Sequence, residues 1–129
     1  MKRLFDFIIP SAHAQEYASS SYYPAKCNLG TLGYEDLWPS KGDFDFNDLV
    51  TDYNFEHHMD ADGNLKKMSV HFILKANGAN YPNGLALGLP IPADKVLSVS
   101  GNIVNEWFYE TEANGVEKGH ANAVIIIAG

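Results

Sequence analysis

The residues most able to do chemistry are oxygen-bearing side chains crowded into one segment, residues 34–49, which reads YEDLWPSKGDFDFNDL. Its core alternates acidic and aromatic residues and then ends on two adjacent polar residues: Asp43, Asp45, Asn47 and Asp48. Carboxylates held this close repel one another unless a positive charge lies between them, and Lys41 is the only cation within the segment. Ca²⁺, which accepts about six to eight oxygen ligands in irregular geometry, would relieve this repulsion.

We therefore predict a Ca²⁺ site in the acidic loop, residues 35–48, with four ligands: Asp43, Asp45, Asn47 and Asp48. Three further acidic residues are candidates to complete the shell: Glu35, Asp36 and Asp52. The segment lacks the glycine and the closing glutamate of an EF-hand, and it contains no histidine or cysteine that would favour zinc. The alternative is an ordinary turn with solvated acids. In either case the aromatic rings are expected to anchor one side of the loop in a core: Tyr34, Trp38, Phe44 and Phe46.

Two other groups of polar residues are weaker candidates. The segment 60–64, Asp-Ala-Asp-Gly-Asn, resembles half of a calcium loop, but its Asp-Gly pair is typical of a hairpin turn, and we interpret it as one. His57 and His58 are adjacent in a predicted strand, so their rings should point to opposite faces of the sheet. We do not expect them to share a metal ion.

The strongest structural pattern is an alternation of apolar and polar residues on both sides of this turn. In residues 49–59 the apolar set is Leu49, Tyr53, Phe55 and Met59, and the polar set is Asp52, Asn54, Glu56 and His58. In residues 68–75 the apolar set is Met68, Val70, Phe72 and Leu74. This period of two predicts a long β-hairpin.

The rest of the chain contains shorter candidate strands separated by Gly, Asn and Pro: residues 28–38, 85–89, 96–99, 103–109 and 123–128. No segment has a convincing helical period. Regular short strands with such turns predict an all-β fold, an antiparallel β-sandwich or jelly roll. The apolar run 123–128 is followed by no further strand, so we expect the domain to be incomplete at its C-terminus.

The N-terminal residues have features of a secretory signal. Lys2 and Arg3 precede a mostly apolar stretch, and residues 12–14, Ala-His-Ala, have the form of a signal-peptidase site. We predict a signal peptide over 1–14, although Asp6 interrupts it, with a disordered or strand-like lead-in as the alternative. A linker over 15–27 and a β domain over 28–129 would follow. No apolar run reaches the roughly 18 residues that a membrane-spanning helix needs.

Composition narrows the class of protein. The chain has 129 residues and a net charge of −7, which argues against nucleic acid or an anionic membrane as partner. Cys27 is the single cysteine, so an internal disulfide is impossible and its role stays open. The common signatures of hydrolases, zinc proteases and nucleotide-binding enzymes are absent, which favours a non-catalytic role.

Two stretches, Thr31 to Pro39 and Lys41 to Tyr53, resemble the signature of the LruC-domain family. These are exported bacterial proteins whose domain has been classed as being of unknown function. The resemblance covers residues about 24–129, and in that family the domain continues past the late apolar strand. It implies a secreted or envelope-associated β-rich protein and supplies no catalytic residue. The acidic loop is also similar to loops in modules of calcium-dependent bacterial adhesins, which is analogy at the level of the module.

Together, the residues and the resemblance favour a non-catalytic, calcium-stabilised β-sandwich module of an exported bacterial protein. Its role would be surface adhesion or binding of an extracellular or envelope ligand, a carbohydrate or a protein. One alternative is a carbohydrate-binding module whose aromatic platform is Trp38, Trp107 or Tyr109. Exposure of both tryptophans would favour this alternative. The other is a secreted hydrolase, which two loop carboxyls about 5–9 Å apart in an open cleft would favour.

Overall fold

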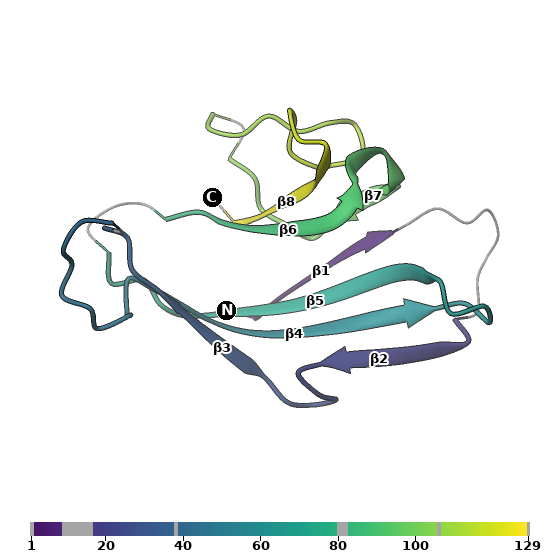
Figure 1. The fold of residues 1–129 in the computed structure, drawn as a ribbon, viewed down its shortest axis with the longest axis horizontal. Coiled ribbons are helices and arrows are strands. Elements are labelled where there is room, and N and C mark those ends of the chain that lie inside the picture. Colours follow the sequence, from purple (N-terminus) through teal and green to yellow (C-terminus); the bar gives the residue numbers. More distant parts are fainter. Residues whose placement is uncertain (1, 9–16, 38, 80–82, 106, 129) are drawn as a thin grey trace.

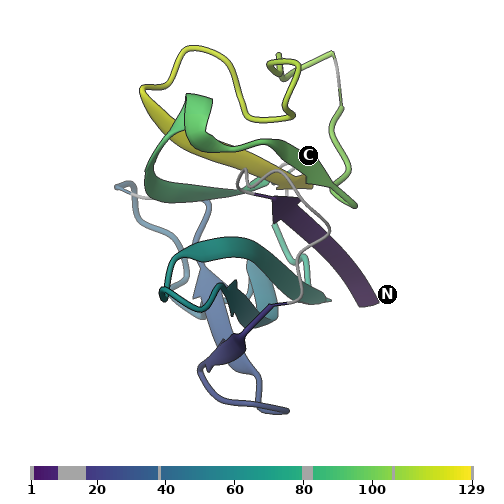
Figure 2. The same cartoon turned by 90° about the vertical axis from the view of Figure 1, so that its right-hand side faces the viewer.

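The computed structural model describes residues 2–8, 17–37, 39–79, 83–105 and 107–128, of which 2–8 are described by their backbone. These residues form two layers of antiparallel strands, a six-stranded sheet and a two-stranded sheet (Figures 1 and 2). The predicted all-β, sandwich-like fold is confirmed. Its elements are β1 (Lys2–Ile8), β2 (Ser19–Tyr23), β3 (Gly30–Tyr34), β4 (Leu49–Met59), β5 (Leu65–Ala76), β6 (Leu85–Pro92), the short 3₁₀ helix η1 (Ala93–Lys95), β7 (Ser98–Ser100) and β8 (Asn122–Ala128).

The β4–β5 hairpin, which the alternating pattern predicts, lies at the centre of the larger sheet. The larger sheet has the order β2-β4-β5-β1-β7, with β3 also paired to β4. At the hairpin turn, Asp60 Oδ1 accepts the backbone N–H groups of Asp62 at 3.0 Å and Asn64 at 2.8 Å, and Gly63 has a φ of 81°. The segment 60–64 is therefore a turn held by its first carboxylate.

The core lies between the two layers. From β5 it takes Met68, Val70 and Phe72, and Tyr53 and Phe55 of β4 pack beside them. The smaller sheet contributes Ala123, Ile125 and Ile127. Burial of these apolar side chains is the main force that holds the layers together.

The late apolar strand, β8, pairs with a strand that precedes it in the chain. β8 pairs with β6 through Leu85 to Gly88, and β6 precedes it in sequence. Its second edge is also engaged, since Glu117 N–H donates to Val124 O at 2.8 Å and Ile103 N–H to Ile127 O at 3.1 Å. This apolar run therefore has a partner strand that precedes it in the chain.

Residues 15–27, expected to be a linker, contain β2. This strand pairs with residues 55–59 of β4, and β3 pairs with residues 49–53, so both lie along one edge of the same strand. Ser19, Ser20 and Ser21 have no apolar alternation that would indicate a strand. The strand forms because the edge of β4 offers backbone partners.

Two shorter predictions also change. The residues described within 103–109 form no strand: Ile103 makes an isolated bridge to Ala128, and Trp107 and Phe108 lie in a turn. The strand expected over 96–99 is β7, which begins at Ser98 because Val96 caps η1 through its bond to Ala93 O. Trp107 and Phe108 are exposed, and local hydrogen bonds to Asn105 hold them in the turn in place of strand pairing.

The predicted signal peptide includes a strand of the larger sheet. β1 lies between β5 and β7, and its residues 2–8 pair with residues 67–73 of β5. Cleavage after Ala14 would remove this strand, and the predicted cleavage segment lies outside the described residues. Among the described residues, no helix is both long and apolar enough to cross a membrane.

Candidate metal centre

The acidic loop is held at one end of the larger sheet by the strands that flank it. β3 ends at Tyr34 and β4 begins at Leu49, and these two residues pair directly, so the loop closes on itself (Figure 1). Within it the backbone is strongly bent, because Phe44 and Phe46 have φ angles of 60° and 55°. Left-handed conformations at alternate positions interrupt the extended chain that would spread the acidic residues apart.

Three carboxylates converge in this loop: Glu35, Asp43 and Asp45. One carboxylate oxygen from each lies within 4.8 Å of the other two. Glu35 is half-buried, whereas the two aspartates are exposed, so the cluster has a protein side and a solvent side. An all-oxygen group of this kind suits a hard cation such as Ca²⁺.

Glu35 has a second feature that suits a cation. Its Oε1 accepts the backbone N–H of Phe46 at 2.5 Å. Its Oε2 is buried and has no hydrogen-bond partner among the described residues. A buried acceptor without a partner costs about 1–3 kcal/mol, more when it is charged, so a bound cation would stabilise this oxygen. The residues present therefore fit a calcium ion.

Gly42 allows this arrangement. A Cβ at this position would lie 2.7 Å from Glu35 Oε2, closer than side-chain carbons approach an oxygen. Any larger residue would displace the carboxylate or the loop. Gly42 was not among the predicted site residues, and its role is visible only once Glu35 is placed in space.

The other two predicted main ligands form hydrogen bonds within the loop, and Asn47 contacts the cluster directly through Asp45. Asn47 donates from Nδ2 to Asp45, and its backbone carbonyl accepts the N–H of Gly78 at 3.1 Å. Asp48 accepts the backbone N–H of Asp36 at 3.0 Å through Oδ2. These bonds fix the shape of the loop and its attachment to the segment after β5.

The second-choice ligands Asp36 and Asp52 have different surroundings. Burial, followed by the nearby carboxylates of Asp48 and Asp43, raises the pKa of Asp36. Asp52 lies on β4, where it accepts a hydrogen bond from Thr31 Oγ1 at 2.7 Å and pairs with Lys75 Nζ at 3.2 Å. These partners lower the pKa of Asp52, and its charge is already compensated.

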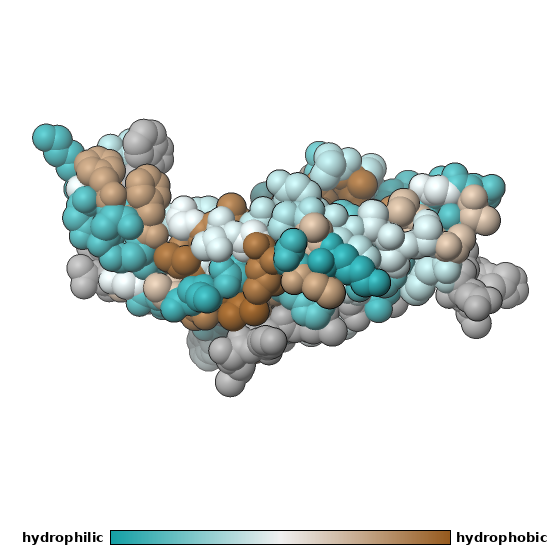
Figure 3. All heavy atoms as spheres, turned by 90° about the horizontal axis from the view of Figure 1, so that it is seen from below, coloured by the Kyte–Doolittle hydropathy of each residue, from teal (hydrophilic) through white to brown (hydrophobic). Residues whose placement is uncertain are grey.

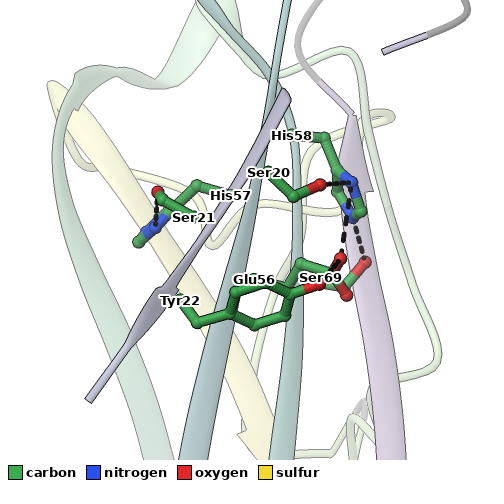
Figure 4. A network of polar contacts seen from close by, with 7 residues as sticks. All are labelled: Ser20, Ser21, Tyr22, Glu56, His57, His58 and Ser69. Carbon is green, nitrogen blue, oxygen red and sulfur yellow. Dashed lines mark hydrogen bonds and ion pairs between the residues drawn. The ribbon is translucent and has the colours of Figure 1, made fainter. Parts of the chain in front are cut away.

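The two histidines point to different sides of β4, as predicted (Figure 4). His58 lies between Ser20 Oγ at 3.1 Å and Ser69 Oγ at 3.2 Å, whereas His57 lies 3.5 Å from Ser21 Oγ. Beside them, Tyr22 OH donates to Glu56 Oε1 at 2.7 Å. This network joins β2 to β4 and was not found from sequence.

The aromatic residues of the loop are exposed, contrary to expectation. Phe44 and Phe46 have exposed fractions of 57% and 56%, and that of Tyr34 is 41%. In Figure 3, hydrophilic and hydrophobic side chains lie next to each other at the loop end of the molecule, on the left. Trp38 lies outside the described residues.

These rings border a hollow beside the carboxylate cluster. Its volume is about 350 Å³, and its lining consists of Gly33, Tyr34, Glu35, Ser40, Gly42, Phe44 and Phe46. Glu35 is thus shared between the carboxylate cluster and the wall of the hollow. The sequence shows the rings and the acids, but only the bent backbone brings them around one space.

The other candidate platform residues differ in exposure. Trp107 is almost fully exposed, at 93%. Tyr109 is half-buried, and its hydroxyl lies against Gly84, where no Cβ would fit. Of these two residues, only Trp107 offers an open ring.

Comparison with known proteins gives one match. The family model described as "Domain of unknown function (DUF4842)" matches residues 63–129, just over half of the chain. The match begins in the β4–β5 turn and continues through β8, so the acidic loop lies outside it. No curated protein and no solved structure matches the chain.

Proposed function

This chain belongs to the family of the domain of unknown function DUF4842, whose description names no activity, and we propose its function from the acidic loop itself. The loop binds one Ca²⁺ through Glu35, Asp43 and Asp45, and the ion stabilises the β3–β4 connection. The protein is a non-catalytic, calcium-stabilised β-sandwich module of an exported bacterial protein. It acts in surface adhesion or in binding an extracellular or envelope ligand.

One observation carries the metal proposal: three carboxylates converge in the loop, and one of them, Glu35, also has a buried oxygen with no hydrogen-bond partner among the described residues. A cation at this point would offset both the mutual repulsion and the cost of the buried oxygen. Backbone carbonyls and water would supply the remaining ligands that Ca²⁺ requires. Three converging carboxylates also suit a cation better than the separated acid and base of a hydrolase.

Export is supported by two features of the sequence. Residues 1–14 have the pattern of a signal peptide, and residues 31–53 resemble the signature of the LruC-domain family. The DUF4842 match begins at residue 63, so the LruC resemblance depends on a part of the chain that this match does not include.

The decisive experiment is calcium titration of the full chain, followed by calorimetry and by the melting temperature. A ligand that binds only the folded state adds RT ln(1 + [L]/Kd), about 2.7 kcal/mol at a hundredfold excess over Kd. We expect Asp45→Ala to abolish the calcium response. Asp62→Ala, a matched exposed aspartate in the hairpin turn, should keep it. A melting temperature that millimolar Ca²⁺ leaves unchanged would sink the proposal.

A carbohydrate-binding module is the second candidate. The observation that favours it is the exposed ring of Trp107, because an open indole provides an apolar face that could stack on a sugar ring. Retention on polysaccharide gels that Trp107→Ala abolishes would support this position for the platform.

A further inference from the structure

We propose that the hollow beside the acidic loop is a carbohydrate-binding subsite walled by Tyr34, Phe44 and Phe46; this inference rests on the proposed ligand-binding role of the module. It places the stacking platform at the loop and not at Trp107. The hollow, of about 350 Å³, is within the size range of small-molecule sites, about 300–1,000 Å³.

Phe44 and Phe46 are unfavourable for the stability of the protein itself. Each exposes more than half of its surface, and each adopts a left-handed backbone conformation that bulky residues rarely take. Glycine or asparagine would fit both positions with less strain, and a polar side chain would suit the exposure. A strained and exposed aromatic pair around one space is what a ligand-binding wall requires.

The chemistry of the lining selects the class of ligand. Aromatic rings stack on the apolar face of a sugar, while the Ser40 hydroxyl can exchange hydrogen bonds with its hydroxyl groups. The exposed Asp43 and Asp45 leave the outer side of the carboxylate cluster open, so that a bound cation could also meet sugar oxygens. The net charge of −7 disfavours an anionic membrane as the occupant.

The test uses the full chain, fluorescently labelled, on a printed array of bacterial and mammalian glycans in millimolar Ca²⁺. We expect binding to a subset of glycans, weakened about tenfold by Phe44→Ala or Phe46→Ala, which is the scale of one aromatic contact. Phe46→Tyr should retain binding, because it keeps the ring. Trp107→Ala, which removes a more exposed ring that does not line the hollow, should leave binding unchanged.

Several results would overturn this inference: no glycan bound, binding lost only in Trp107→Ala, or capture by phosphatidylserine vesicles in place of glycans. Melting curves of the Phe variants separate it from the calcium proposal. If these variants lose glycan binding but keep the calcium-induced rise in melting temperature, both hold. If calcium has no effect on melting but the Phe variants still lose glycan binding, the calcium proposal fails and the carbohydrate subsite stands.

Discussion

At the scale of single residues, Glu35 connects the two parts of the proposed site. One of its carboxylate oxygens fixes the loop through the Phe46 N–H, and the other is buried beside Gly42 with no hydrogen-bond partner among the described residues. Its side chain also lines the hollow. The residue can therefore hold a cation on one side and border a ligand on the other.

A substitution at Gly42 tests whether calcium affinity depends on the position of the Glu35 carboxylate. Gly42→Ala would put a Cβ 2.7 Å from Glu35 Oε2 and push it from the cluster. We expect calcium affinity to fall about 10- to 100-fold, as for other residues that position a metal ligand. Isothermal titration calorimetry measures it, with Gly88→Ala as control, since a Cβ there meets nothing within 4 Å. Equal affinities in the two variants would contradict the geometry.

Asp60 gives a pH-dependent prediction that is separate from the metal site. Hydrogen bonds from Asn64, followed by Lys66 at 3.1 Å, lower the pKa of Asp60 to about 2. The unfolded value is about 3.9, so its contribution to stability is present above about pH 4 and is lost as pH falls towards 2. Melting temperatures of wild type and Asp60→Asn should therefore converge over this interval.

At the scale of elements, one buried side chain anchors the edge strands. Asn54 of β4 is 8% exposed, and its Nδ2 donates to Ala25 O at 2.9 Å and Asn28 O at 2.6 Å. These carbonyls lie in the turn between β2 and β3, and among the described strands these two pair only with β4. The position of the acidic loop depends on β3, so Asn54 supports the site from a distance.

Asn54→Ala should lower the free energy of unfolding by about 1–3 kcal/mol, because two part-buried hydrogen bonds, each worth about 0.5–1.5 kcal/mol, are lost. Amide hydrogen exchange should accelerate in β2 and β3 before it does in β5. Ser21→Ala is the control, since its contact with His57 is exposed and 3.5 Å long. Uniform acceleration across all strands would show that Asn54 stabilises the whole sheet and not this edge.

At the scale of the whole molecule, the two layers share one core, and β1 lies between β5 and β7 in the larger sheet. If residues 1–14 are a cleaved signal, the mature protein lacks β1, and residues 67–73 of β5 lose a partner strand. An open central edge with apolar neighbours promotes pairing with another chain.

We therefore expect the chain from Gln15 to self-associate or to melt at a lower temperature than the full chain. Size-exclusion chromatography with light scattering, alongside thermal unfolding, compares the two. A monomer from Gln15 with an unchanged melting temperature would show that β1 contributes nothing to the folded domain.

The sequence by itself determined the features that depend on neighbouring residues. The β4–β5 hairpin follows from strict alternation and an Asp-Gly turn, and the burial of β8 follows from a continuous apolar run. The crowding of acidic residues between β3 and β4 is also visible in the sequence, because the residues are adjacent.

Only the tertiary structure decided how those residues are used. Glu35 meets Asp43 and Asp45, while Asp52 pairs with Lys75, because strand pairing and a bent backbone bring distant residues together. In the same way β2 forms on a free edge of β4, and β6 supplies the partner of β8. The prediction that the loop phenylalanines are anchored in a core was wrong because the loop backbone is bent. Alternation indicates faces only in an extended chain, and the left-handed φ angles at Phe44 and Phe46 depart from that conformation.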